Sequence, residues 1–408
     1  MAVQVEKSVD ALLLMLAVVR SGGVLLPLNT GYTPEDVNYF VRDSEAAVLV
    51  DDVRLAELRG AAEGLSPTFD WPDAAPDDLA ALLYTSGTTG QPKGAMLTQR
   101  NLASNADVLH RLWGFTSDDV LLHALPIFHT HGLWVALNCV LASGSSMVFL
   151  PRFDVDATLD ALGSCTVMMG VPTYYTRLLD EPRFDGGPLR LYISGSAPLL
   201  ASTHEAFTAR TGRAILERYG MTETGMLTSN PLDGERRPGT VGFPIPGTEV
   251  RIGADDVVEV RGPNVFEGYW GRPELAETEF TPDGWFRTGD VGRFDDEGYL
   301  HLVGRAKDLV ITGGLNVYPV EVEGVIDEID GVAESAVIGV PDADLGEAVV
   351  AVVVPEPGVV LDAEAVRAAA RDRLAGFKSP KRVEIVDALP RNAMGKVEKA
   401  TLRATFGG

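Results

Sequence analysis

The sequence predicts an α/β protein with a large N-terminal region and a small α+β region at its C-terminal end. Apolar helices, glycines and short apolar strands alternate through most of the chain before Thr248, and such alternation is typical of layered α/β folds. From about Thr248 the pattern changes to strands and turns, with turn signals at Asp283-Gly284 and Glu297-Gly298. This change indicates that the C-terminal part of the chain has a different fold from the part before it.

The composition excludes several classes of protein. The 408 residues include 34 Lys and Arg against 58 Asp and Glu, a formal charge of −24, and 46% are apolar. The length predicts two to four globular domains. Nucleic-acid phosphates and anionic membranes repel so acidic a chain. Cys139 and Cys165 lie in apolar stretches, which argues against a disulfide framework or a cysteine zinc site and favours the cytoplasm.

The first predicted element is a buried helix over Ala11 to Val19. Its nine apolar residues are too few to span a bilayer. A signal peptide is the alternative, because Lys7 precedes the run, but the acidic flank at Glu6 and Asp10 and the lack of an Ala-x-Ala cleavage site argue against it.

Short apolar runs predict the strands that follow. They lack period-two polarity, which predicts strands covered on both faces. The runs are Val24–Leu28, Ala46–Val50, Met147–Leu150, Thr166–Met169 and Leu191–Ile193.

A domain boundary is predicted near Lys307, which divides the chain into residues 1–306 and 307–408. The second part reads as a small α+β domain of two helices and two strands. The helices are predicted over Pro319–Ile329 and Ala363–Leu374, and the strands over Ala336–Val340 and Ala348–Val354.

Tyr84 to Gly94 reads Y-T-S-G-T-T-G-Q-P-K-G and follows the strand-like Leu82-Leu83. Glycines let backbone N–H groups approach an anion, hydroxyls donate hydrogen bonds and Lys93 adds a positive charge, so the segment suits a phosphate. It is not a Walker A loop, because Pro92 and Gly94 stand where that motif needs Gly and Ser or Thr. A flexible surface loop is the alternative.

Together with six further blocks, this loop resembles the adenylate-forming superfamily of acyl-CoA synthetases, luciferases and adenylation domains. The blocks keep the family's order over nearly the whole chain. They are P-I-F-H-T-H-G (Pro126–Gly132), S-G-S-A-P (Ser194–Pro198), E-R-Y-G-M-T-E-T (Glu217–Thr224), G-W-F-R-T-G-D (Gly284–Asp290), G-R-A-K-D (Gly304–Asp308) and P-R-N-A-M-G-K (Pro390–Lys396).

The resemblance implies a large layered αβαβα domain and a small mobile α+β domain that rotates about Lys307. Two departures accompany it. The chain begins inside the family's large domain, so that domain is N-terminally shortened, and Arg251–Arg261 lacks much of a Gly-rich hairpin near Gly253-Ala254-Asp255. Both departures are expected to affect the stability of the fold more than the reaction, because every signature block is present.

The resemblance also implies an ATP and AMP site. Tyr219 can stack on adenine across the small residues of the Gly195 turn, while Asp290 and Arg305 can bond the ribose hydroxyls; read singly, Asp290 is a turn residue and Arg305 a solvated charge. The implied nucleotide residues are Thr85, Ser86, Gly87, Thr88, Thr89, Lys93, Gly195, Ser196, Ala197, Glu217, Arg218, Tyr219, Gly220, Met221, Thr222, Asp290 and Arg305.

By the same resemblance, Glu223 and Thr85 hold Mg²⁺, which prefers few carboxylates together with phosphate oxygens and water. Thr222 faces the α-phosphate, and Lys396 is the catalytic lysine of adenylation. Coenzyme A then attacks the acyl-adenylate, with Gly313 and Gly314 beside its narrow channel.

Arg177, in G-V-P-T-Y-Y-T-R-L-L (Gly170–Leu179), is the strongest clue to the acid, because burying an arginine among apolar residues is costly without an anion. The stretch resembles malonyl-CoA synthetases, in which the matching arginine anchors a second carboxylate. His129 and His131 then lie at the acyl pocket, which Ser196 and Met226 also line. The alternative is an exposed Arg177 that pairs with Asp180 or Glu181.

The sequence therefore predicts a malonate-CoA ligase that forms malonyl-CoA, AMP and pyrophosphate and also accepts methylmalonate. Its partners are small molecules, namely malonate, ATP and CoA. Three alternatives stay open: a ligase for another short or medium acid, a module that loads a separate carrier protein, and a non-catalytic nucleotide-binding remnant.

Overall fold

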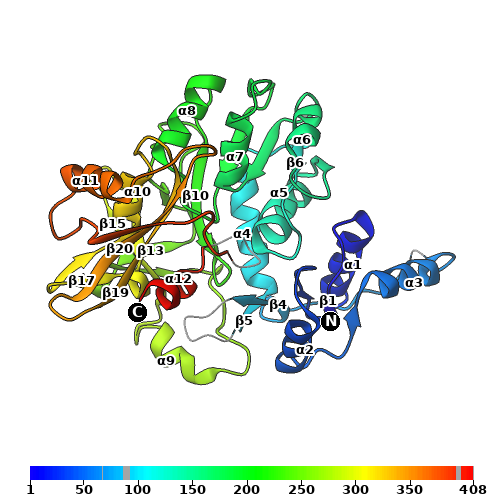
Figure 1. Ribbon diagram of the computed structural model, residues 1–408. Helices are drawn as coiled ribbons and strands as arrows, with labels where there is room; N and C mark the ends of the chain where they lie inside the picture. Colours follow the sequence, from blue (N-terminus) through cyan, green and yellow to red (C-terminus); the bar gives the residue numbers. More distant parts are fainter. Residues whose placement is uncertain (67, 86–91, 392–396, 408) are drawn as a thin grey trace. The chain divides into compact units, whose positions relative to one another are not determined.

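The computed structural model describes residues 1–66, 68–85, 92–391 and 397–407 (Figure 1). The chain divides into two compact units. The first comprises Met1–Arg251, Glu259–Arg287 and Asp295–Leu300, and the second comprises Ile252–Val258, Thr288–Phe294 and His301–Gly408. The α/β class is confirmed. The boundary between residues 306 and 307, and a hinge at Lys307, stay predictions.

A seven-stranded sheet forms the centre of the first unit, in the order β12-β11-β10-β9-β8-β6-β7. The strands from β7 to β10 pair in parallel, and β11 and β12 are antiparallel. The strands are β6 (Val120–His123), β7 (Ser146–Phe149), β8 (Val167–Gly170), β9 (Leu191–Ser194), β10 (Leu216–Met221), β11 (Gly225–Ser229) and β12 (Phe243–Pro244).

Helices cover both faces of this sheet. Leu121 and Val167 pack into one apolar core with α4 and α5, whereas their neighbours Leu122 and Met168 pack into another with α6, α7 and α8. Strands β8 and β9 are buried throughout, as predicted, but β7 is partly exposed because it is the edge strand. The helices are α4 (Gln99–Leu112), the π-helix η1 (His131–Ala136), α5 (Leu137–Ser143), α6 (Val155–Leu162), α7 (Pro172–Leu179) and α8 (Ala201–Thr211).

The N-terminal segment forms a small parallel sheet, β2-β1-β3, and an antiparallel hairpin, β4-β5. The predicted first helix is α1, which Ser8 caps by accepting a hydrogen bond from the Ala11 N–H. It buries Leu12 and Met15 but leaves Leu13 58% exposed. The elements are β1 (Ala2–Val3), α1 (Val9–Arg20), β2 (Leu26–Pro27), α2 (Pro34–Asp43), β3 (Leu49–Val50), α3 (Asp52–Ala62), β4 (Leu79–Thr85) and β5 (Lys93–Thr98).

Strands β13, β14, β15 and β16 form a four-stranded sheet in that order. The boundaries that divide the chain into the two units fall at residues of these strands. The predicted short loop between β13 and β14 is a tight turn with Asp255 and Asp256 at positive φ. The elements are β13 (Glu249–Ile252), η2 (Ala254–Asp256), β14 (Val257–Arg261), η3 (Pro273–Leu275), α9 (Ala276–Glu279), β15 (Phe286–Phe294), β16 (Leu300–Arg305) and η4 (Ala306–Asp308).

The rest of the second unit is the predicted small α+β fold. Its sheet has the order β18-β17-β20-β19, with β21 parallel to β20. The predicted helix over residues 319–329 ends earlier, at Ile326. The elements are β17 (Val310–Thr312), β18 (Leu315–Val317), α10 (Pro319–Ile326), β19 (Val332–Asp342), β20 (Gly346–Pro355), α11 (Ala363–Arg373), β21 (Arg382–Ile385) and α12 (Lys399–Phe406).

Within the described part of the chain, no helix has the length and apolar character that a membrane span requires. Cys139 and Cys165 are both free thiols in the apolar cores.

Candidate functional site

Strand β10 and its turn into β11 carry the block E-R-Y-G-M-T-E-T. Side chains alternate along β10, so Glu217 and Tyr219 project to one side and Arg218 to the other. A Cβ at Gly220 would overlap the carbonyl oxygen of Gly225 on the paired strand. Glycine at position 220 therefore permits the close approach of β10 and β11, where the ladder register shifts.

Arg218 is a buried cation. Its side chain is 2% exposed, and its Nε and Nη2 atoms have no hydrogen-bond partner among the described residues. Its guanidinium lies directly against Gly195, at the end of β9, where any Cβ would collide with it. Burial lowers the pKa of Arg218 to about 10, so the group is still charged at neutral pH. An uncompensated buried charge is costly and marks a place where an anion is stabilised.

Glu217, on the other side of β10, does not neutralise this charge. Burial raises the pKa of Glu217 to about 8, so the carboxyl is mostly protonated at neutral pH. Its Oε1 accepts a hydrogen bond of 3.3 Å from the Leu199 N–H, while Oε2 has no partner among the described residues.

His131 joins the site from the π-helix η1. Its Nδ1 lies 3.2 Å from the Oγ of Ser196, which has φ of +73° in the turn after β9. Burial, and then the positive charge of Arg218, lower the pKa of His131 well below its usual value. His131 is thus a neutral imidazole beside a cationic group. His129 is half-buried in the loop before this helix.

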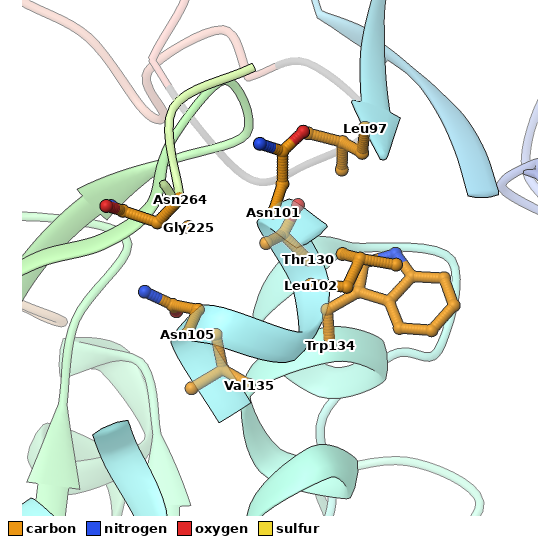
Figure 2. A pocket seen from close by; sticks show the side chains of 9 residues that line it. All are labelled: Leu97, Asn101, Leu102, Asn105, Thr130, Trp134, Val135, Gly225 and Asn264. Atoms are coloured by element: carbon orange, nitrogen blue, oxygen red, sulfur yellow. The ribbon is translucent and has the colours of Figure 1, made fainter. Parts of the chain in front are cut away.

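A pocket opens between α4, η1 and β11 (Figure 2). It contains about 280 Å³ of empty space, part of it open to solvent. Thr130 Oγ1 and Trp134 Nε1 at its wall have no hydrogen-bond partner among the described residues. Asn105 fixes the neighbouring Met226, because its Oδ1 accepts from the Met226 N–H and its Nδ2 donates to the Met226 carbonyl, both at 3.0 Å.

The predicted metal-binding residues lie next to one another. Thr85, at the end of β4, donates its hydroxyl to Glu223 Oε1 at 3.2 Å. Lys93, at the start of β5, forms an ion pair of 3.4 Å with Glu279. A carboxylate beside a hydroxyl, close to a phosphate-loop lysine, is the kind of donor set that fits Mg²⁺ with phosphate oxygens and water.

The structure corrects the expected burial of Arg177. On α7, Tyr175 and Leu178 form the buried stripe, which leaves Arg177 exposed. Arg177 makes no ion pair with Asp180 or Glu181 either, since the Glu181 carboxylate pairs with Arg183. The buried arginine of the site is therefore Arg218, which the sequence had associated with the nucleotide.

The second unit contains the predicted ribose pair. Arg305 Nε, at the end of β16, lies 2.6 Å from Oδ1 of Asp290 in the middle of β15. Burial lowers the pKa of Lys307. Gly313 and Gly314 form the β17-β18 turn at φ of +57° and +77°, a conformation that favours glycine. The predicted residues Ser86, Gly87, Thr88, Thr89 and Lys396 lie outside the described residues.

The signature blocks define an enzyme of the adenylate-forming class, and comparison with known proteins supports this. A family model described as "AMP-binding enzyme" matches residues 1–270, and one described as "AMP-binding enzyme C-terminal domain" matches residues 321–396. The chain belongs to this family.

Individual relatives are similar over nearly the whole chain. The ATP-bound MatB of Rhodopseudomonas palustris is 53% identical with a TM-score of 0.95, and the match covers 100% of this chain and 88% of that one. A malonyl-CoA ligase with bound methylmalonyl-CoA and AMP is 38% identical with a TM-score of 0.69, covering 96% and 90%. A malonate-CoA ligase of Arabidopsis thaliana is 36% identical, covering 95% and 74%.

Proposed function

We propose that the protein is an ATP-dependent malonate-CoA ligase. A malonate carboxylate attacks the α-phosphate of ATP and releases pyrophosphate, and the thiol of coenzyme A then attacks the malonyl-adenylate and releases AMP. The observation that supports the choice of acid is the buried guanidinium of Arg218 beside the Gly195–Ser196 turn, whose Nε and Nη2 atoms have no hydrogen-bond partner among the described residues. The identity of 53% to MatB supports the same choice.

Arg218 supplies the charge that a second substrate carboxylate needs. A dicarboxylate neutralises this buried cation, whereas acetate or a fatty acid leaves it unpaired, so the arginine favours malonate over monocarboxylates. We assign Arg177 to the outer end of the acyl site, because its side chain is exposed. Met226 then faces the α-carbon of the acid, and methylmalonate is a second substrate.

Each candidate nucleotide-binding residue has its own role in this proposal. Tyr219 stacks on adenine, Asp290 accepts the ribose hydroxyls, and Lys93 contacts the terminal phosphates. Glu223 and Thr85 would hold Mg²⁺, which when bound would neutralise phosphate charge. Thr222 stabilises charge at the α-phosphate, and Lys396 bridges that phosphate and the acyl carboxylate. A cytoplasmic location is part of this proposal.

The test is AMP release by the purified protein with ATP, Mg²⁺ and CoA, with malonate, methylmalonate, acetate and octanoate compared in parallel. Malonate-dependent AMP at a rate well above that with acetate supports the proposal. Activity with a monocarboxylate alone contradicts the dicarboxylate site. ATP binding by folded protein without AMP release from any acid contradicts the ligase itself.

A further inference from the structure

Tyr269 contacts two charged side chains, Glu223 and Lys93, to which the proposed function assigns the metal and the terminal phosphates. Its hydroxyl donates a hydrogen bond of 2.9 Å to Glu223 Oε1. The Lys93 ammonium lies 4.9 Å from the centroid of its ring. The backbone holds Tyr269 in place, since it forms a bridge with Ala95 on β5 and the next N–H, of Trp270, donates to the Gly94 carbonyl.

The two oxygens of Glu223 are in different situations. Oε1 accepts hydrogen bonds from both Tyr269 and Thr85, at 2.9 and 3.2 Å. Oε2 accepts none from the described residues. The main chain of Glu223 is also held, because its carbonyl accepts the Phe266 N–H at 2.8 Å. The carboxylate is thus oriented with one oxygen engaged and the other available to a cation.

The ring of Tyr269 attracts the Lys93 ammonium, while its hydroxyl binds Glu223. An aromatic face attracts an ammonium group without occupying its N–H donors as an acceptor oxygen would. The Lys93 side chain is 11% exposed and has Glu279 as its carboxylate partner. The ring therefore holds the Lys93 ammonium in place while leaving its protons available to phosphate oxygens.

We infer that Tyr269 is a positioning residue that aligns Glu223 and Lys93 for a metal-bound triphosphate. The inference rests on the proposed function, because that function supplies the nucleotide. Groups that orient a ligand through a hydrogen bond typically change metal affinity by about 10-fold to 100-fold when removed. The effect of losing the Tyr269 hydroxyl is therefore expected on the divalent cation more than on the fold.

The test uses Mn²⁺ in place of Mg²⁺, with ATP and without malonate, and measures free Mn²⁺ by electron paramagnetic resonance. Tyr269→Phe keeps the ring and removes the hydroxyl, and it is expected to raise the half-saturating Mn²⁺ concentration about 10-fold. Tyr299→Phe is the matched control, since its hydroxyl donates a bond of the same 2.9 Å to the Glu235 carbonyl. An unchanged affinity, or an equal shift in the control, overturns the inference.

A double-mutant cycle with Glu223→Gln separates positioning from a folding defect. If Tyr269 acts through Glu223, its replacement lowers Mn²⁺ affinity in the wild-type background but not in the Gln background. Equal losses in both backgrounds overturn the inference. A wild-type protein that binds Mn²⁺ and ATP but releases no AMP with malonate contradicts the proposed ligase, while the comparison of the two tyrosine variants still decides the role of Tyr269.

Discussion

At the scale of the residue, burial distinguishes the arginine that the sequence assigned to the acid from the one that it assigned to the nucleotide. Arg177 stands among aromatic and aliphatic neighbours in the chain, yet the helix turns its side chain to solvent. Arg218 stands between Glu217 and Tyr219, yet it is buried without a carboxylate partner among the described residues. A bound anion would stabilise this charge, which makes Arg218 the better candidate for substrate selection in the proposed function.

Arg218→Met is expected to lower kcat/KM for malonate by about 100-fold, because a buried charge pair typically contributes several kcal/mol to binding. Activity with acetate is expected to change little. The free energy of unfolding is not expected to fall, because the substitution removes an uncompensated charge. The assay is AMP release with each acid, together with urea unfolding. A larger loss in Arg177→Met than in Arg218→Met would contradict the assignment.

Glu217 predicts a pH dependence of stability. Burial raises its pKa from the usual 4.5 to about 8, so between these values the folded chain holds a proton that the unfolded chain has released. The contribution of protonated Glu217 to the free energy of unfolding is complete below about pH 4.5. It is lost as pH rises toward 8, and the total loss is roughly 3 to 5 kcal/mol. Glu217→Gln is expected to flatten this decline in urea unfolding at pH 5, 6.5 and 8. The exposed Glu249→Gln serves as the control, and an unchanged slope in Glu217→Gln would refute the prediction.

At the scale of the element, the turn between β10 and β11 brings the block E-R-Y-G-M-T-E-T next to the pocket of Figure 2. Its geometry depends on a helix distant in sequence, since Asn105 on α4 binds both backbone polar groups of Met226. Asn264 adds hydrogen bonds to the carbonyls of Thr224 and Met226. These amide side chains replace the partners that a further strand would supply, so they hold Glu223 and Met226 at fixed positions.

Asn105→Ala is expected to lower the free energy of unfolding by about 1 to 3 kcal/mol, because it removes the acceptor of the buried Met226 N–H, while Asn264 still donates to the Met226 carbonyl. Urea denaturation measures this change. Asn316→Ala, at an exposed position of β18, is the control and is expected to stay within about 0.5 kcal/mol of the wild type. Equal effects of the two substitutions would show that the hydrogen bonds from Asn105 to Met226 contribute no stability.

At the scale of the whole molecule, the proposed reaction divides between the two units. The first unit contains the proposed acyl pocket and the proposed metal-binding residues, while the second contains the proposed ribose pair and the turn at Gly313 and Gly314. In the proposed mechanism, Lys396 serves the first half-reaction alone, and rotation about Lys307 brings the glycine turn to the coenzyme A channel for the second.

Lys396→Ala is therefore expected to lower malonyl-AMP formation by at least about 100-fold. Thioester formation from supplied malonyl-AMP and CoA is expected to stay near the wild-type rate, because the lysine has left the site by then. Pyrophosphate release and malonyl-CoA formation are measured separately. Equal losses in both half-reactions would contradict this division.

The sequence by itself determined the α/β class, most strand and helix positions and the signature blocks, because these follow from local periodicity and from short strings of residues. Helix ends were less certain: the helix predicted to Ile329 ends at Ile326. The edge position of β7 and the exposure of Leu13 were not predicted, since both depend on which neighbours pack against them.

Only the tertiary structure decided which charged groups are buried and which contact each other. The Arg218 guanidinium lies against Gly195, and the Tyr269 hydroxyl reaches Glu223, across separations in the chain that no local pattern encodes. Whether a side chain is buried or paired depends on contacts with residues that are distant in the sequence. The free-energy cost of an unpaired buried charge therefore depends on the same contacts. The sequence alone thus predicts the chemistry of the family from its signature blocks. The choice of Arg218 as the residue that binds the second carboxylate depends on burial, which only the folded structure shows.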